Sequence, residues 1–99
     1  MGAASDDDTA RRRMRMRAWR RGTREMDLIL GPFADAMLPA MDASACTEFE
    51  ALLDENDQDL YAWVSGRLSG NGTLGPAHHA ALLDRIARHA AERLRGAAG

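Results

Sequence analysis

Lysine is absent from this 99-residue chain, because all thirteen basic residues are arginines. Phosphate-binding loops of the Walker type need a lysine after their last glycine, so the glycine-rich stretch "GRLSGNGTLG" (66–75) is predicted to be a flexible linker. Cysteine is nearly absent too. Cys46 has no second thiol with which to form a disulfide or a CxxC metal site, and its spacing to Phe49 and Leu53 indicates a core residue.

Long hydrophobic runs are also missing. No stretch approaches the roughly 18 apolar residues of a membrane span, so no membrane insertion is expected. The N-terminus resembles neither a secretory signal nor a mitochondrial transit peptide, since Asp6, Asp7 and Asp8 precede the arginines. We therefore expect a cytoplasmic protein of the bacterial type.

No catalytic pattern stands out. His78 and His79 are adjacent, so in an α-helix they would point about 100° apart, and we predict that they do not share a metal ion. His89 lies ten residues beyond His79. No serine or cysteine has a histidine and a carboxylate at a recognisable spacing. We expect a protein that is not an enzyme and that binds no metal.

Charge is strongly segregated along the chain. Residues 1–24 carry a net charge of +5, residues 25–60 carry −10, and residues 61–99 carry +3. This pattern indicates a charged partner surface, an intramolecular match between the basic first helix and the acidic middle, or both.

Apolar residues recur at spacings of three and four, which predicts an all-α fold, a compact bundle of five short helices. One domain is expected over residues 9–95, between a disordered acidic tail (1–8) and a flexible C-terminus (96–99). The side chains expected in the core are Met26, Ile29, Leu30, Leu52, Leu53, Leu60, Trp63, Leu83, Ile86, Ala90 and Leu94.

Helix boundaries follow from the capping residues. Thr9 is predicted to cap the first helix, Asp42 the third and Asp57 the fourth, which Gly66 would end. Pro76 suits the first position of the last helix. In the second helix, Pro32 predicts a kink or two abutting helices.

The turn between the first two helices, "RRGTRE", has two interpretations. If the second helix starts at Thr23, Gly22 is its N-cap and Glu25 stands at the third helical position, where a carboxylate caps well. This account does not explain why Arg20, Arg21 and Arg24 crowd the turn, nor why glycine is used. The alternative is a docking surface that another protein approaches closely.

The arginine run "RRRMRMRAWRR" also fits a nucleic-acid-binding or antitoxin-like regulatory protein, with Trp19 stacking on a base. The interspersed Met14 and Met16 favour a core instead, and the acidic middle would repel a polyanion. No nucleic acid is therefore expected as a partner. A structural module without a further role is the third alternative.

The stretch "RAWRRGTREMDLILGPFAD" (17–35) resembles the succinate dehydrogenase flavinylation factors. Their Arg-Gly-x-x-Glu signature matches Arg21, Gly22 and Glu25, and an aspartate and apolar segment follow it, as here from Asp27. The similarity extends through "LLDENDQDLYAWVSG" (52–66) and covers about residues 10–94. Gln58 replaces a proline that is frequent in relatives, and the loop before the last helix is unusually rich in glycine.

The resemblance implies a non-enzymatic five-helix bundle that binds the flavoprotein subunit of succinate dehydrogenase, and in bacteria that of fumarate reductase. Binding would promote covalent attachment of FAD to a histidine of that subunit. FAD would be handled by the partner, with no cofactor bound stably by this chain, which we expect to be a monomer. The residues implied at or near the contact are Arg20, Arg21, Gly22, Arg24, Glu25, Asp27 and Phe33, the last of which could equally pack inside.

Overall fold

The computed structural model describes residues 6–70 and 74–98, and within those ranges it contains helices and no strand. The all-α prediction is confirmed. The five α-helices are α1 (Asp6–Trp19), α2 (Arg24–Met37), α3 (Ala43–Leu53), α4 (Asp57–Leu68) and α5 (Ala80–Ala98). Two short 3₁₀ helices, η1 (Leu38–Ala40) and η2 (Ala77–His79), precede α3 and α5.

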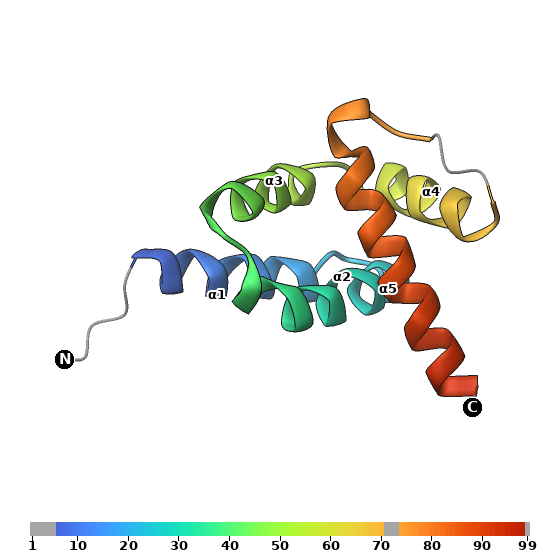
Figure 1. Cartoon of the computed structure of the whole chain (residues 1–99), viewed down its shortest axis with the longest axis horizontal. Helices are drawn as coiled ribbons and strands as arrows, with labels where there is room; N and C mark the ends of the chain where they lie inside the picture. The colour runs from blue at the N-terminus through green and yellow to red at the C-terminus, as the bar shows by residue number, and fades with distance from the viewer. Residues whose placement is uncertain (1–5, 71–73, 99) are drawn as a thin grey trace.

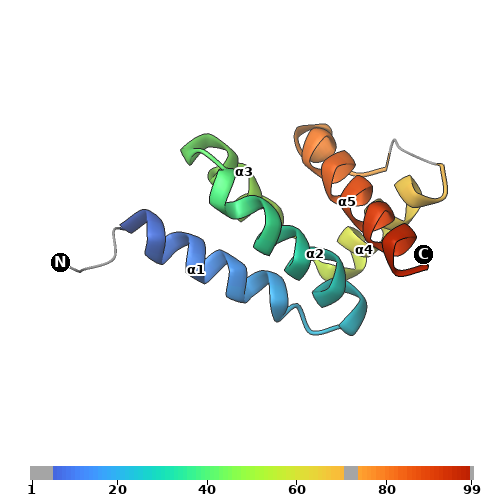
Figure 2. The ribbon, with the colours of Figure 1, turned by 60° about the horizontal axis from the view of Figure 1, so that its bottom comes forward.

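The helices form two groups that meet at α2. Helices α1 and α2 lie side by side and run in opposite directions, and α3 packs against α1 (Figures 1 and 2). Helices α4 and α5 form the second group, and both contact α2. The turns α1–α2 and α3–α4 are thereby brought close together, although more than thirty residues separate them.

The core joins the two groups through large side chains that are fully buried. Phe33 and Phe49 lie at its centre with ring centroids 5.8 Å apart. Most of the predicted core residues are buried, while Ile29 and Trp63 pack at its edge. Leu94 was predicted to be in the core and is 64% exposed, because α5 extends beyond the other helices at that end (Figure 1).

Two helix starts differ from the predictions. α1 begins at Asp6, so residues 6–8 lie in its first turn rather than in a tail, and Thr9 lies inside the helix instead of capping it. Residues 1–5 and Gly99 lie outside the described residues, and residues 96–98 lie in α5. Asn56, not Asp57, caps α4, with its Oδ1 accepting from the Gln58 N–H at 2.8 Å.

Of the remaining predicted helix boundaries, some are confirmed and others are wrong. Asp42 caps α3 as predicted, accepting from the Ala45 N–H at 2.8 Å. α4 continues past Gly66 to Leu68, so Gly66 does not end it. Of the predicted glycine-rich linker, residues 71–73 lie outside the described part of the chain. Pro76 stands at the N-cap of η2, just before the last helical segment.

α2 is one continuous helix across Pro32, so the alternative of two abutting helices is wrong. A helical proline removes one backbone hydrogen bond and leaves the carbonyl four residues earlier without its helical donor. That carbonyl belongs to Leu28, and Arg93 of α5 donates to it at 3.1 Å. A contact between helices thus replaces the donor that proline lacks.

Gly31 makes the close approach of α1 to α2 possible. A Cβ placed on Gly31 would lie 2.3–2.6 Å from three ring atoms of Trp19. The indole therefore lies directly on the glycine backbone, and its Nε1 is 3.2 Å from both carboxylate oxygens of Asp35. This contact uses the ring that was considered for base stacking.

Candidate functional site

The turn between α1 and α2 is held by two of the residues that the sequence placed at a partner contact. The Arg21 side chain is only 9% exposed, and all three of its guanidinium nitrogens donate within the protein. Nε bonds Asp57 Oδ1 at 2.7 Å, and the terminal nitrogens bond the Leu53 and Glu55 carbonyls at 2.6 and 2.9 Å. Arg21 therefore uses its guanidinium inside the protein instead of presenting it to solvent, where a partner's carboxylate was expected to meet it.

Arg21 is buried because it satisfies helix ends. The last carbonyls of a helix have no partner inside it, and an arginine suits both these groups and the negative end of the dipole. Leu53 is the last residue of α3, and Asp57 is the first of α4. One side chain therefore ties the α1–α2 turn to the α3–α4 turn.

Asp27 completes this turn. Its Oδ1 accepts the backbone N–H of Arg21 at 2.6 Å. Phe33 is 0% exposed and touches Phe49 and His89, so it belongs to the core and not to a contact surface. The open alternative for Phe33 is thereby decided by packing.

Gly22 is exposed and adopts a φ of +105°, which side chains resist. A Cβ there would lie 3.9 Å from an Asp57 carboxylate oxygen, so lack of space does not explain the glycine. The N-cap of α2 is Thr23, whose Oγ1 accepts from the Met26 N–H at 3.3 Å. The prediction of Gly22 as cap with Glu25 at the third position is therefore wrong by one residue.

Glu25 is exposed on the first turn of α2, together with its neighbour Arg24, and Arg20 is exposed just before the turn. Within residues 6–70 and 74–98 the Glu25 carboxylate has no hydrogen-bond or ion-pair partner. A free carboxylate near the positive end of a helix is an acceptor whose position is fixed by the backbone. Of the sequence-predicted residues, Arg20, Gly22, Arg24 and Glu25 thus lie on the surface.

Beside Glu25 runs an apolar groove of about 420 Å³ between α2, α4 and α5. Leu28, Tyr61, Leu68 and Leu94 in this groove are exposed, whereas Ile29 is partly buried against the core. Glu25 and Arg93 bring charge to the groove. The lining residues are Glu25, Leu28, Ile29, Tyr61, Ser65, Leu68, Ala90, Arg93 and Leu94. A second hollow of about 300 Å³, lined by Thr23, Glu25, Asp57, Gln58 and Tyr61, continues from it at Glu25 and Tyr61.

Sequence reasoning missed this groove. Tyr61, Ser65 and Leu68 are spaced by four and three residues, so they form a second stripe on α4 beside the core stripe of Leu60 and Val64. That spacing was visible in the sequence. The partner stripes on α2 and α5 become meaningful only when the three helices are assembled.

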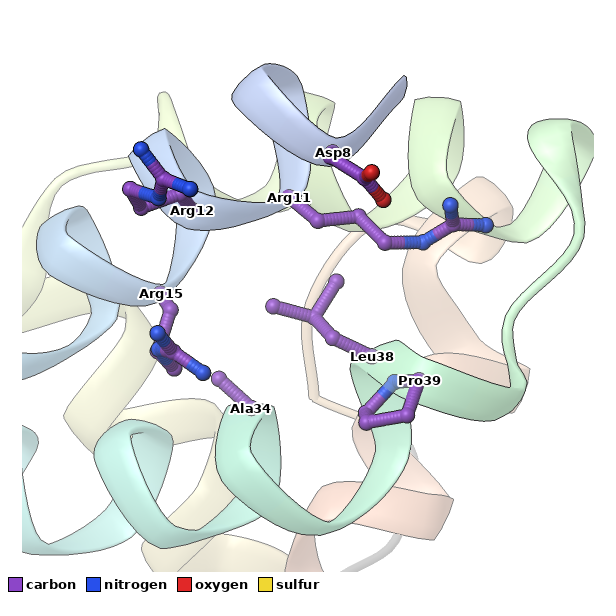
Figure 3. A pocket seen from close by; sticks show the side chains of 7 residues that line it. All are labelled: Asp8, Arg11, Arg12, Arg15, Ala34, Leu38 and Pro39. Carbon is purple, nitrogen blue, oxygen red and sulfur yellow. The ribbon is translucent and has the colours of Figure 1, made fainter. Parts of the chain in front are cut away.

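The arginine-rich helix α1 is largely engaged inside the molecule. Arg11 donates to the Met41 carbonyl at 2.5 Å, Arg17 to Asp54 at 2.6 Å, and Arg15 lies 3.9 Å from Asp35. Figure 3 shows Arg11 stretched over Leu38 in a hollow of about 320 Å³ whose floor includes Ala34 and Pro39. The predicted match between the basic helix and the acidic middle is confirmed, which weakens the nucleic-acid alternative.

Glu55, whose carbonyl accepts from Arg21, also belongs to a cluster of side chains that could bind a metal ion. Glu55, His78 and His79 each offer a ligand atom, and these atoms lie within 4.8 Å of one another. The expectation that the two adjacent rings point apart assumed an α-helix and does not apply here. The two histidines lie in η2, not in an α-helix, and their rings sit 4.1 Å apart.

A family model and individual relatives place this chain in the same protein family. A family model described as "Flavinator of succinate dehydrogenase" matches residues 12–90. The "FAD assembly factor SdhE" of Vibrio cholerae is 34% identical over 88 residues, which cover 88% of this chain and 98% of that protein. None of the described helices is long and apolar enough to cross a membrane.

Two further relatives are covered less completely. The "FAD assembly factor SdhE" of Acetobacter pasteurianus is 41% identical over 68 residues, 68% of this chain and 62% of the relative. The "Succinate dehydrogenase assembly factor 2, mitochondrial" of Aspergillus terreus is 37% identical over 71 residues, 72% of this chain and 24% of the relative. The chain thus spans less than two thirds of these two proteins.

Proposed function

Because the chain belongs to the succinate dehydrogenase flavinator family, we propose that it is an assembly factor that promotes covalent FAD attachment to the flavoprotein subunit of succinate dehydrogenase. The flavoprotein of fumarate reductase is a second client in this proposal. The factor acts as a monomer in the cytoplasm. The observation that carries the proposal is the family match over residues 12–90.

The proposed docking face consists of Gly22, Glu25 and the apolar groove. Protein interfaces combine exposed aromatic and aliphatic anchors with a polar rim, and Tyr61, Leu28 and Glu25 supply these elements here. A standard interface buries about 800 Å² on each partner, so the groove would form its centre and the turn its edge. Arg20 and Arg24 beside the turn would steer an acidic client.

Rigidity is the second element of the proposal. The guanidinium of Arg21 and the carboxylate of Asp27 hold the turn from inside, so the backbone that carries Glu25 need not be ordered on docking, which lowers the entropic cost. Arg21 therefore acts as a positioning residue. This role accounts for its presence in the turn without a direct contact to the client.

The factor itself is proposed to be non-catalytic. Flavin attachment is chemistry of the isoalloxazine ring and of a histidine in the client. Binding would shift the client toward the conformation in which that histidine faces the ring. The client holds FAD throughout, so the factor alone should leave the fluorescence of free FAD unchanged.

A reconstitution tests the proposal. Purified apo-flavoprotein and FAD are incubated with the factor, and covalent flavin is read as fluorescence in a denaturing gel. Glu25→Gln and Tyr61→Ala should reduce stimulation about tenfold or more at limiting factor, the scale of one lost charged hydrogen bond. Glu48→Gln, an exposed carboxylate on α3, is the matched control and should behave as wild type.

The outcomes separate the levels of the proposal. If the wild-type factor gives no stimulation, the assembly function is wrong. If both variants stimulate like Glu48→Gln, the function stands and the docking face is wrong. Salt-sensitive binding to labelled RNA, without flavoprotein binding, would instead favour the nucleic-acid alternative.

A further inference from the structure

Three side chains that could ligate a metal ion come together from two segments that are distant in the sequence. Glu55 lies in the α3–α4 turn, whereas His78 and His79 lie in η2 at the start of the last helical segment. Glu55 Oε2 is 2.9 Å from His79 Nε2, although 24 positions separate the two residues. The His78 ring packs beside that of His79.

The backbone on both sides of this cluster is fixed. The Glu55 carbonyl accepts from Arg21, its N–H donates to Leu52, and the next residue, Asn56, caps α4. On the other side, the His79 N–H donates to the Pro76 carbonyl, and His79 is 3% exposed. The backbone segments that carry the donors are therefore held near one another before any ion arrives, which lowers the entropic cost of binding.

The donor set selects a class of ion. Two imidazoles and one carboxylate suit zinc and its neighbours among the divalent transition metals, whereas magnesium and calcium prefer oxygen ligands. Ligand atoms of a tetrahedral zinc ion lie about 3.4 Å apart, as follows from bonds of roughly 2.0–2.2 Å. The 4.8 Å spread closes by rotation of side chains, and His78 is exposed and free to turn.

We propose that Glu55, His78 and His79 form a binding site for a zinc-class divalent cation, which fastens the start of the last helical segment to the α3–α4 turn. The ion takes the place of the Glu55–His79 hydrogen bond, and solvent supplies the ligand on its open side. Because the site joins segments that separate on unfolding, occupancy stabilises the folded chain by mass action.

Thermal denaturation of the full chain, prepared without a histidine tag, tests the proposal. Zinc chloride at about a hundred times its Kd should raise Tm by roughly 10 °C or more relative to EDTA. Cobalt chloride should give the visible absorption of a tetrahedral cobalt site. Magnesium chloride should leave Tm unchanged.

Variants locate the site. Glu55→Gln keeps a hydrogen-bonding group toward His79, and His78→Ala removes an exposed ring, so both should fold and melt within a few degrees of wild type in EDTA. Each should weaken zinc binding at least tenfold and abolish the cobalt spectrum. Glu48→Gln and Cys46→Ser should keep the full response, which excludes a surface carboxylate or the thiol.

Contrary outcomes are equally clear. The proposal is wrong if zinc leaves the wild-type Tm unchanged, if the rise persists in both Glu55→Gln and His78→Ala, or if magnesium produces the same rise. The experiment uses the isolated chain, so its result does not depend on flavoprotein docking.

Discussion

Arg21 and Glu25 stand four residues apart on the same turn, yet one is buried in the protein and the other faces solvent. Arg21 bonds Asp57 and two carbonyls, while the Glu25 carboxylate has no partner among the described residues. The difference shows that neighbouring charged residues of one short motif can face opposite ways. In the proposed function, Arg21 holds the turn and Glu25 is the residue presented to the client.

The largest effect should come from removing the inner residue. Arg21→Met should lower the free energy of unfolding by about 3 kcal/mol, because it leaves the partly buried Asp57 carboxylate, the helix-end Leu53 carbonyl and the Glu55 carbonyl of the next turn without this donor. Arg24→Met, its exposed neighbour, should change stability by less than about 0.5 kcal/mol. Urea denaturation of the pair measures the contrast, and equal losses would remove the inside–outside distinction.

The next largest effect is expected at Gly31, where the Trp19 ring lies against the helix backbone. In Gly31→Ala, helix propensity alone would stabilise α2 by about 1 kcal/mol. The clash with the Trp19 ring should instead destabilise the protein by about 1–3 kcal/mol. In a Trp19→Ala background, where the ring is gone, Gly31→Ala should instead stabilise the protein. Calorimetry of the single and double variants measures both effects. A stabilised Gly31→Ala single variant would contradict the described contact.

Gly22→Ala should lower the free energy of unfolding by about 1–2 kcal/mol, because side chains resist a φ of +105°. No steric clash adds to this loss, since space is available for a Cβ. Gly70→Ala is the matched control, since Gly70 has a φ of +94° and no neighbour within 4 Å. Chemical denaturation should give similar losses for both variants. Flavinylation at saturating, folded protein should fall only for Gly22→Ala if the turn docks.

The smallest effect on stability is expected at the outer face. Leu28→Ala should change the free energy of unfolding by about 0.5 kcal/mol or less, because the side chain is exposed. Its affinity for the flavoprotein should nevertheless fall several-fold, as measured by calorimetric titration. Met16→Ala, an equally exposed residue of α1, should leave this affinity unchanged.

Much of the fold was predictable because helical signals are local. Spacings of three and four residues identified the buried faces around Leu30, Leu53 and Ile86, and the side chain of Asp42 marked a helix start. The exact capping residues were harder to predict than the buried faces. At Thr23 and Asn56 the true cap stands one residue from the predicted one, because neighbouring residues offer similar acceptors.

The candidate site was only half predictable. The sequence drew attention to the turn, and Gly22 and Glu25 do lie on its surface. It did not reveal that Arg21 turns inward, because the carbonyls that attract it come from residues 32 and 34 positions away. Phe33 likewise looked suitable for a surface until α3 supplied Phe49 as its partner.

The sequence by itself determined the helices, the opposite charges of α1 and the acidic middle, and membership of the family, since all three are encoded in local order and composition. The tertiary structure alone decided that Arg21 turns inward, where α2, α4 and α5 leave a groove, and that Glu55 meets two histidines. The physical reason is distance along the chain. Each of these features depends on groups from distant parts of the chain that only packing brings close together.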